Sequence, residues 1–396
     1  MKIFNPVSLS LFCLTILVQC FLPLLGVAPN RIIRPASLFY SDCYTNPVLI
    51  SNTLLQLFLL ALILLPPTKL RLLLMLAVCA LLTFSLSLFC AQFAEQGTQL
   101  SQRTRFSFGG GFWLLTLLWL LIGLDRLQQC VSVFWQKTTL GLCMSLPLTL
   151  LFMSNYVTHL SLVQEYYANI DTFQQAFAEH LSIVALTLLF TLPIAFLLGT
   201  SCHSFPQFGR VCLHALGLLQ TIPSIALFGL LLEPLALLSR AYPWLSQVGI
   251  KGIGIAPAVI ALILYSLLPV VRGIVTGLDE ISAQTLDAAS GLGMKNYQLL
   301  IHVKLPLALP VILSGVRVMC VQTIGLTMVA ALIGAGGFGA IMFRGLANSA
   351  LDLTLLGVMP VVMMAMITDM LFRLLEQWSH YTYAFTKVRD QVRQND

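Results

Sequence analysis

The chain has 396 residues, of which 58% are hydrophobic and 9% are charged. A soluble domain carries roughly 25% charged residues, so this composition excludes a soluble globular protein and predicts one embedded in a lipid bilayer. The net charge of +6 is spread over many short segments, which indicates membrane topology and attraction to lipid rather than nucleic-acid binding. The ten cysteines form no C-x-x-C pair and indicate neither a disulfide framework nor a zinc site.

Apolar runs long enough to cross about 30 Å of hydrocarbon as helices follow one another along the chain. They lie near residues 8–27, 47–66, 72–93, 109–124, 138–153, 181–200, 211–238, 253–275, 307–333 and 351–375. The first run is longer than the apolar core of a signal peptide, so we expect an uncleaved first span. We expect an all-α polytopic protein of about ten transmembrane helices without β structure, because in lipid only helices or closed barrels satisfy the backbone.

An acidic connector at residues 154–180 divides the chain. It carries Glu165, Asp171 and Glu179 but no Lys or Arg. Residues 1–153 are predicted to form an N-terminal membrane block of about five helices, residues 181–375 a second block of five, and residues 376–396 a tail.

Lys and Arg predict the orientation. With the N-terminus inside and ten crossings, 13 of the 21 positive side chains fall on inside segments and seven outside, and Arg317 falls within a span. By the positive-inside rule this excess places both termini and the polar segment 276–306 in the cytoplasm. The acidic connector is then outside.

The segment 276–306 contains a spaced motif. Asp287-Ala288-Ala289 is followed by Gly293 and, after nine intervening residues, by Val303-Lys304-Leu305-Pro306. This pattern resembles the cytoplasmic docking loop of ABC importer permeases, which reads EAA, three residues, Gly, nine residues, I-x-L-P, with Asp287 here for Glu and Val303 for Ile.

Physical reasoning supports a docking role for this segment. A short helix with a small-residue patch can seat in a groove of a partner and act as a lever. We expect Ala288, Ala289 and Gly293 to permit close approach, Asp287 to lie in the first helical turn, and Pro306 to end the loop before the next span. The alternative is an ordinary amphipathic loop helix.

The second block carries further motifs, namely Gln220-Thr221-Ile222-Pro223-Ser224, the stretch 254–262, Tyr265–Arg272 and Gly334–Gly339. Together they resemble the permeases of glycine betaine, choline, carnitine and proline betaine importers, a branch of the type I ABC importers. The resemblance implies a bacterial inner-membrane permease that pairs with a second permease copy, an ABC ATPase and an external solute-binding protein. It also implies a quaternary-ammonium solute, for which a cation–π cage would belong to the binding protein.

Gly334, Gly336 and Gly339 satisfy G-x-G-x-x-G, but they follow a membrane span rather than a strand. A turn that lets helices pack closely is therefore expected instead of a dinucleotide site. The chain has no P-loop motif, so we expect no cofactor on this chain, with ATP used by the partner ATPase.

Gln220, Thr221, Pro223 and Ser224 are candidates for a translocation path, because a proline break frees a carbonyl that polar neighbours can meet. The alternative is a proline kink whose polar groups are satisfied by neighbouring helices. Asp369 and Arg373 are predicted to form a structural ion pair one turn apart. No catalytic group and no metal site is predicted.

The sequence thus predicts a permease subunit of an ATP-driven importer for a compatible solute. An importer of another small solute, such as an amino acid, is the first alternative. A membrane-embedded enzyme or scaffold is the alternative of another class.

Overall fold

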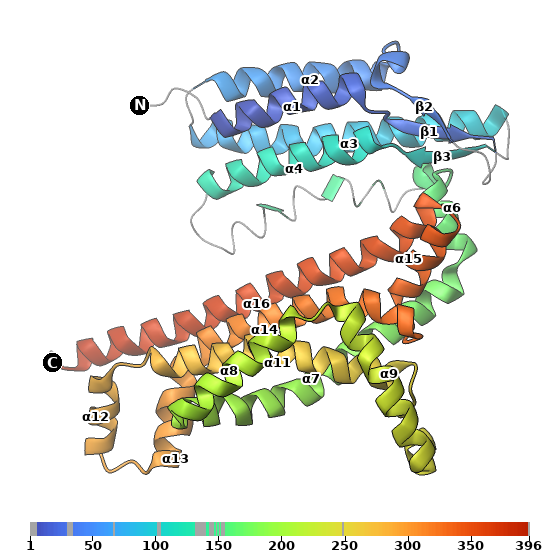
Figure 1. Ribbon diagram of the computed structural model, residues 1–396. Coiled ribbons are helices and arrows are strands. Elements are labelled where there is room, and N and C mark those ends of the chain that lie inside the picture. Colours follow the sequence, from blue (N-terminus) through green and yellow to red (C-terminus); the bar gives the residue numbers. More distant parts are fainter. Residues whose placement is uncertain are drawn as a thin grey trace. The chain divides into compact units, whose positions relative to one another are not determined.

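The computed structural model describes residues 6–29, 35–65, 68–100, 104–130, 140–141, 146–147, 149, 151, 155–247 and 249–394. The chain forms two compact units, Met1–Ala168 and Asn169–Asp396, and each is described by itself. The boundary between them falls within the connector expected at residues 154–180. Figure 1 shows the elements of both units.

Unit 1 is built on four long helices. They are α1 (Pro6–Phe21), α2 (Pro47–Leu64), α3 (Lys69–Leu100) and α4 (Gly110–Cys130). Asn46 begins α2, because its Oδ1 accepts a hydrogen bond from the Val48 amide at 2.9 Å and Pro47 is already set for a first helical turn. Unit 1 also contains the short helices η1 (Tyr40–Cys43), η2 (Asn155–Val157) and α6 (Ser161–Ala168).

A small antiparallel sheet in unit 1 corrects the expectation of no β structure. Its strands are β1 (Leu25–Ala28), β2 (Ala36–Leu38) and β3 (Arg105–Phe108), in the order β2-β1-β3, with Leu25 opposite both Leu38 and Phe108. Phe106 and Phe108 are buried and alternate with half-buried neighbours. The argument from lipid applies to the spans, whereas these strands are only three or four residues long and occur in the connections between helices.

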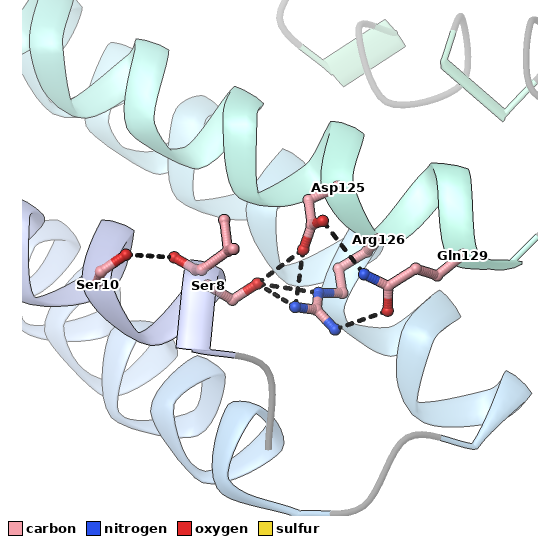
Figure 2. A network of polar contacts seen from close by, with 6 residues as sticks. Ser8, Ser10, Asp125, Arg126 and Gln129 are labelled. Atoms are coloured by element: carbon pink, nitrogen blue, oxygen red, sulfur yellow. Dashed lines mark hydrogen bonds and ion pairs between the residues drawn. The ribbon is translucent and has the colours of Figure 1, made fainter. Parts of the chain in front are cut away.

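Buried polar side chains connect the helices of unit 1. Figure 2 shows the Arg126 guanidinium of α4 among Ser8 of α1, Asp125 and Gln129. Arg126 Nη2 lies 2.8 Å from Asp125 Oδ2, Nη1 donates to Gln129 Oε1 at 3.1 Å, and Nε donates to Ser8 Oγ at 3.1 Å. Arg126 is buried, and these partners compensate the cost of removing its charge from water.

A second polar network centres on Asn52 of α2. Its side-chain amide donates to Leu82 O at 3.1 Å and to Ser85 Oγ at 2.7 Å, both in α3. The phenol of Tyr40 donates to Asn52 Oδ1 at 3.2 Å. Burial raises the pKa of Tyr40 to about 12, so the phenol stays protonated as a donor at physiological pH.

Unit 2 contains one long helical bundle. Its elements are α7 (Ile170–Ser204), α8 (Pro206–Thr221), α9 (Ser224–Ala241), α10 (Pro243–Gln247), α11 (Ile255–Asp279), α12 (Ala283–Gly291), α13 (Asn296–Leu299), η3 (Leu300–Lys304), α14 (Leu305–Ala330), η4 (Ala331–Ile333), α15 (Phe338–Ala347) and α16 (Leu351–Gln394).

Helix α11 is the centre of this bundle and packs most extensively on α14 and α7. Glycines allow the close packing. Gly273 of α11 faces Gly315 of α14, and Gly277 faces Ala308, so a side chain at either α11 position would be tightly crowded. Small residues at such crossings are typical of membrane helix pairs, because they let the backbones approach.

Within the described residues, eight helices are long and apolar enough to cross a membrane, and α1 is a shorter apolar helix. This confirms the helical polytopic class. Most of the expected span 138–153 lies outside the described residues. The expected span 211–238 is wrong as a single helix, because α8 ends at Thr221 and α9 starts at Ser224. The last helix continues from the expected span 351–375 through most of the expected tail.

Candidate functional site

The segment 276–306 is mostly helical rather than a loop. Helix α11 ends at Asp279, and Ser282 caps α12 by accepting a hydrogen bond from the Thr285 amide at 3.3 Å. After a turn, the chain becomes helical again at Asn296 and continues through α13 and η3 into α14. We call residues 280–304 the docking segment, after the role expected of them. The segment consists of α12, the turn that follows it, α13 and η3.

The three residues of the Asp-Ala-Ala motif differ in exposure. Asp287 and Ala288 are exposed, whereas Ala289 is buried within this chain. The expectation that Asp287 lies in the first turn of its helix is wrong, since the Ser282 cap starts α12 four residues earlier. Asp287 therefore presents its charge on the open surface of α12 and not to the helix N-terminus.

Gly293 ends the turn after α12. Its φ of +79° lies in the left-handed region, and its amide donates to Ser290 O at 2.9 Å. A side chain at this position would meet nothing within 4 Å in this chain. Within the chain, then, glycine is required for its backbone conformation, as at many helix C-termini, and not for close packing.

Val303, Leu305 and Pro306 lie in a continuous helix. Val303 belongs to the π-helical turn η3, and Leu305 and Pro306 open α14. The expectation that Pro306 separates a loop from the next span is wrong, because the helix begins ten residues before it. A widened turn directly before Pro306 accommodates the ring and the missing amide hydrogen.

The path candidates gather at the break between α8 and α9. Pro223 forces the preceding residue, Ile222, into an extended conformation with ψ of 128°, so α8 stops. Gln220 Nε2 donates to the backbone oxygen of Tyr265 in α11 at 2.8 Å, and the Tyr265 hydroxyl donates back to Ile222 O. Two hydrogen bonds to Tyr265 therefore hold the chain before Pro223 against α11.

Pro269 explains why the Tyr265 oxygen is open to Gln220. In a regular helix the amide of residue 269 would donate to this oxygen, but proline has no amide hydrogen. The other path candidates are placed differently: Thr221 is exposed and its hydroxyl donates to Leu218 O at 2.7 Å, and Ser224 is half-buried at the start of α9. Of the polar side chains at the break, Gln220 is engaged with α11.

Asp369 and Arg373 lie in α16, with Arg373 Nε 2.7 Å from Asp369 Oδ2. The sequence analysis missed two further members of this network. Arg317 of α14 lies 3.6 Å from Asp369 and 3.2 Å from Glu376 of α16. A lone arginine in an apolar span needs a counter-charge, and that signal could have indicated Arg317.

Comparison with known proteins identifies the family of the chain. The family model described as "Binding-protein-dependent transport system inner membrane component" matches residues 191–380. The osmoprotectant import permease protein OsmW of Salmonella typhimurium is 38% identical over 198 residues, which cover 50% of this chain and 87% of that protein. The chain belongs to this family of inner-membrane permeases.

The permease has further relatives that match about half of its length. It is 31% identical over 204 residues to the glycine betaine/carnitine/choline transport system permease protein OpuCD of Bacillus subtilis, covering 51% of this chain and 82% of that one. A chain of the inward-facing MetNI methionine ABC transporter superposes with a TM-score of 0.41 at 19% identity, covering 52% of this chain and 97% of that chain. This degree of structural similarity says nothing about the solute.

The first half of the permease matches a different family model. The model described as "ABC transporter permease YehY, N-terminal domain" matches residues 5–163. The chain is therefore an ABC importer permease and a multi-pass inner-membrane protein, as the motifs predicted, and its family is one of transporters rather than enzymes.

Proposed function

We propose that this permease imports a quaternary-ammonium compatible solute such as glycine betaine, choline or carnitine. The observation that carries the proposal is the 38% identity to OsmW over 87% of that osmoprotectant permease. The similarity to OpuCD supports the same solute class.

The energy comes from a separate ABC ATPase that binds the docking segment. Support comes from the exposed surface of α12 and its following turn, where Asp287, Ala288 and Leu292 are open to a partner. Leu292 is 79% exposed, and a large apolar side chain standing free is suited to a pocket on another protein. That partner binds and hydrolyses the ATP, and this chain holds no cofactor.

Further partners are a solute-binding protein on the outer side and a second permease copy. Both termini and the docking segment lie in the cytoplasm, and the solute passes near the break between α8 and α9. The proposal for the path is supported by the discontinuity itself, since interrupted helices are common at transport sites.

Uptake by the reconstituted complex tests the solute class. Proteoliposomes with the permease, its ATPase and its binding protein are given radiolabelled glycine betaine, choline, carnitine, proline betaine and a panel of amino acids. ATP-dependent uptake of one or more quaternary-ammonium solutes is expected, with little uptake of amino acids. Uptake of an amino acid alone would favour the alternative importer and overturn the proposed solute.

A further inference from the structure

The turn between η4 and α15, residues 333–338, is built largely from glycine, and we call it the glycine corner. Gly334, Gly336 and Gly337 all have positive φ angles, of 80°, 84° and 75°. Residues with side chains rarely adopt this conformation. The prediction of a turn at these glycines is confirmed.

A carboxylate from α7 is seated in this corner. The Gly337 amide, at the N-terminus of α15, donates to Glu179 Oε2 at 2.8 Å, and Gln175 Nε2 donates to the other oxygen, Oε1, at 2.8 Å. A side chain at Gly336 would overlap the Glu179 carboxylate. A negative charge at this place meets both an amide without a helical partner and the positive end of the helix dipole.

Neighbouring residues of α7 hold the same region. His180 is buried, and its Nε2 lies 3.2 Å from Ile324 O of α14. Phe338, the first residue of α15, is fully buried, with its ring centroid 5.1 Å from that of Phe173 and 5.6 Å from the His180 ring. Two turns of α7 therefore contact both helices that meet at the corner.

The corner and the docking segment lie at opposite ends of one long helix. The helical stretch Asn296–Ile333 has 38 residues, which corresponds to about 57 Å at 1.5 Å per residue. Figure 1 shows α12 and α13 at one end of unit 2 and α15 at the other. A displacement of the docking segment therefore reaches the glycine corner through α14, provided that the far end of α14 is fastened to its neighbours.

We infer that Glu179 is a positioning residue for transport, which fastens the glycine corner to α7 so that movement of α14 carries α7 and α15 with it. The fastening itself follows from the contacts of Glu179 and Gly337. Its role in transport rests on the proposed binding of the ATPase to the docking segment. Without the carboxylate, α14 moves but α7 and α15 follow poorly, and ATP hydrolysis becomes uncoupled from solute movement.

Glu179→Ala tests both parts of this inference. In the purified permease–ATPase complex, hydrogen exchange at the Gly337 amide is expected to rise at least tenfold. In proteoliposomes, uptake is expected to fall at least fivefold, while the ATPase rate stimulated by loaded binding protein stays within twofold. Glu179→Gln, which keeps an accepting oxygen, is expected to be intermediate. Asp171→Ala removes an exposed carboxylate from the same helix and is the matched control, expected to leave both readouts unchanged.

The glycines supply an independent test. Gly334 and Gly336 share a positive φ, but a methyl group added at Gly334 would have no atom nearer than 4.0 Å, whereas one added at Gly336 would overlap Glu179. Gly336→Ala is expected to reduce uptake more than Gly334→Ala, and to do so much less in the Glu179→Ala background.

Unchanged amide exchange in Glu179→Ala would overturn the fastening. Equal losses of uptake and of stimulated ATPase rate, with faster exchange, would overturn its role in coupling. The exchange measurement requires no solute, so its result stands whether or not the solute is a quaternary ammonium compound. Failure of the wild-type complex to transport any such solute would instead count against the proposed function.

Discussion

Gln220 and Pro269 act on the same backbone oxygen, although they belong to different helices. Pro269 leaves Tyr265 O without its helical donor, and Gln220 supplies a donor at 2.8 Å. Because Tyr265 is buried, losing this bond leaves a polar atom away from water, which costs about 1–3 kcal/mol. At the scale of single residues, Gln220 therefore supplies the hydrogen bond that α11 lacks at Tyr265 O, in addition to lying beside the break at Pro223.

A double-mutant cycle separates the two roles of Gln220. We expect Gln220→Leu to lower the free energy of unfolding in detergent by about 1–3 kcal/mol. In a Pro269→Ala background the restored amide of residue 269 can donate to Tyr265 O, so the same change is expected to cost less. Uptake measured in all four proteins shows whether transport follows stability. If Gln220→Leu still abolishes uptake when stability is recovered, Gln220 belongs to the solute path.

A single exposed leucine tests the docking surface. Because Ala289 is buried in this chain and Leu292 is 79% exposed, the docking surface is expected to be more sensitive at Leu292. Leu292→Asp should abolish co-purification of the ATPase and uptake, while the permease still inserts and keeps its melting temperature. Ile253→Asp, at an exposed position before α11, is the control and should retain the ATPase. Normal co-purification by Leu292→Asp would contradict the proposed surface.

At the scale of elements, a charge network joins α14 to α16. Arg317 lies between Asp369 and Glu376, and its side chain and that of Glu376 are mostly buried, whereas Arg373 is at the exposed edge. Exposed ion pairs contribute roughly 0–1 kcal/mol, but removing Arg317 leaves the mostly buried Glu376 carboxylate without its cation, whereas Asp369 keeps Arg373. The two arginines are therefore not equivalent.

Substitution of each arginine tests this difference. Arg317→Gln is expected to lower the melting temperature of the purified permease clearly, and Arg373→Gln to change it little, because only the former leaves a mostly buried carboxylate, that of Glu376, without its cation. A triple variant with Arg317→Gln, Asp369→Asn and Glu376→Gln should recover part of the loss. Equal effects of the two single substitutions would contradict a network centred on Arg317.

At the scale of the whole molecule, the permease consists of a family core in unit 2 and a separate helical unit 1. OsmW covers 50% of this chain, and a different family model matches residues 5–163. Unit 1 contains its own buried polar networks around Arg126 and Asn52, so it has the internal contacts expected of an independently packed domain.

Thiol labelling tests the topology of the whole chain. In a background without the native cysteines, Asp171→Cys in the first turn of α7 should react with an impermeant reagent added outside intact cells. Asn296→Cys at the start of α13 should react only after the membrane is opened, since both positions are exposed but lie on opposite sides in the proposed orientation. Labelling of both from the same side would refute this orientation.

Composition, apolar runs and motif spacing were sufficient to predict the membrane class, the helical fold and the permease family. These properties depend on local order along the chain, because a helix in lipid satisfies its own backbone. The break at Pro223 and the turn at Gly334–Gly337 were also predictable, since both follow from the backbone limits of proline and glycine.

What only the tertiary structure decided is which groups meet across the bundle. Three contacts join residues on different helices: Gln220 with Tyr265 O, Arg317 with Asp369, and Glu179 with the Gly337 amide. The burial of Ala289 is likewise a result of tertiary packing. The sequence separations of the three contacts range up to 158 positions. No periodicity or motif spacing encodes such a pairing, because it depends on how the helices are rotated and stacked against one another.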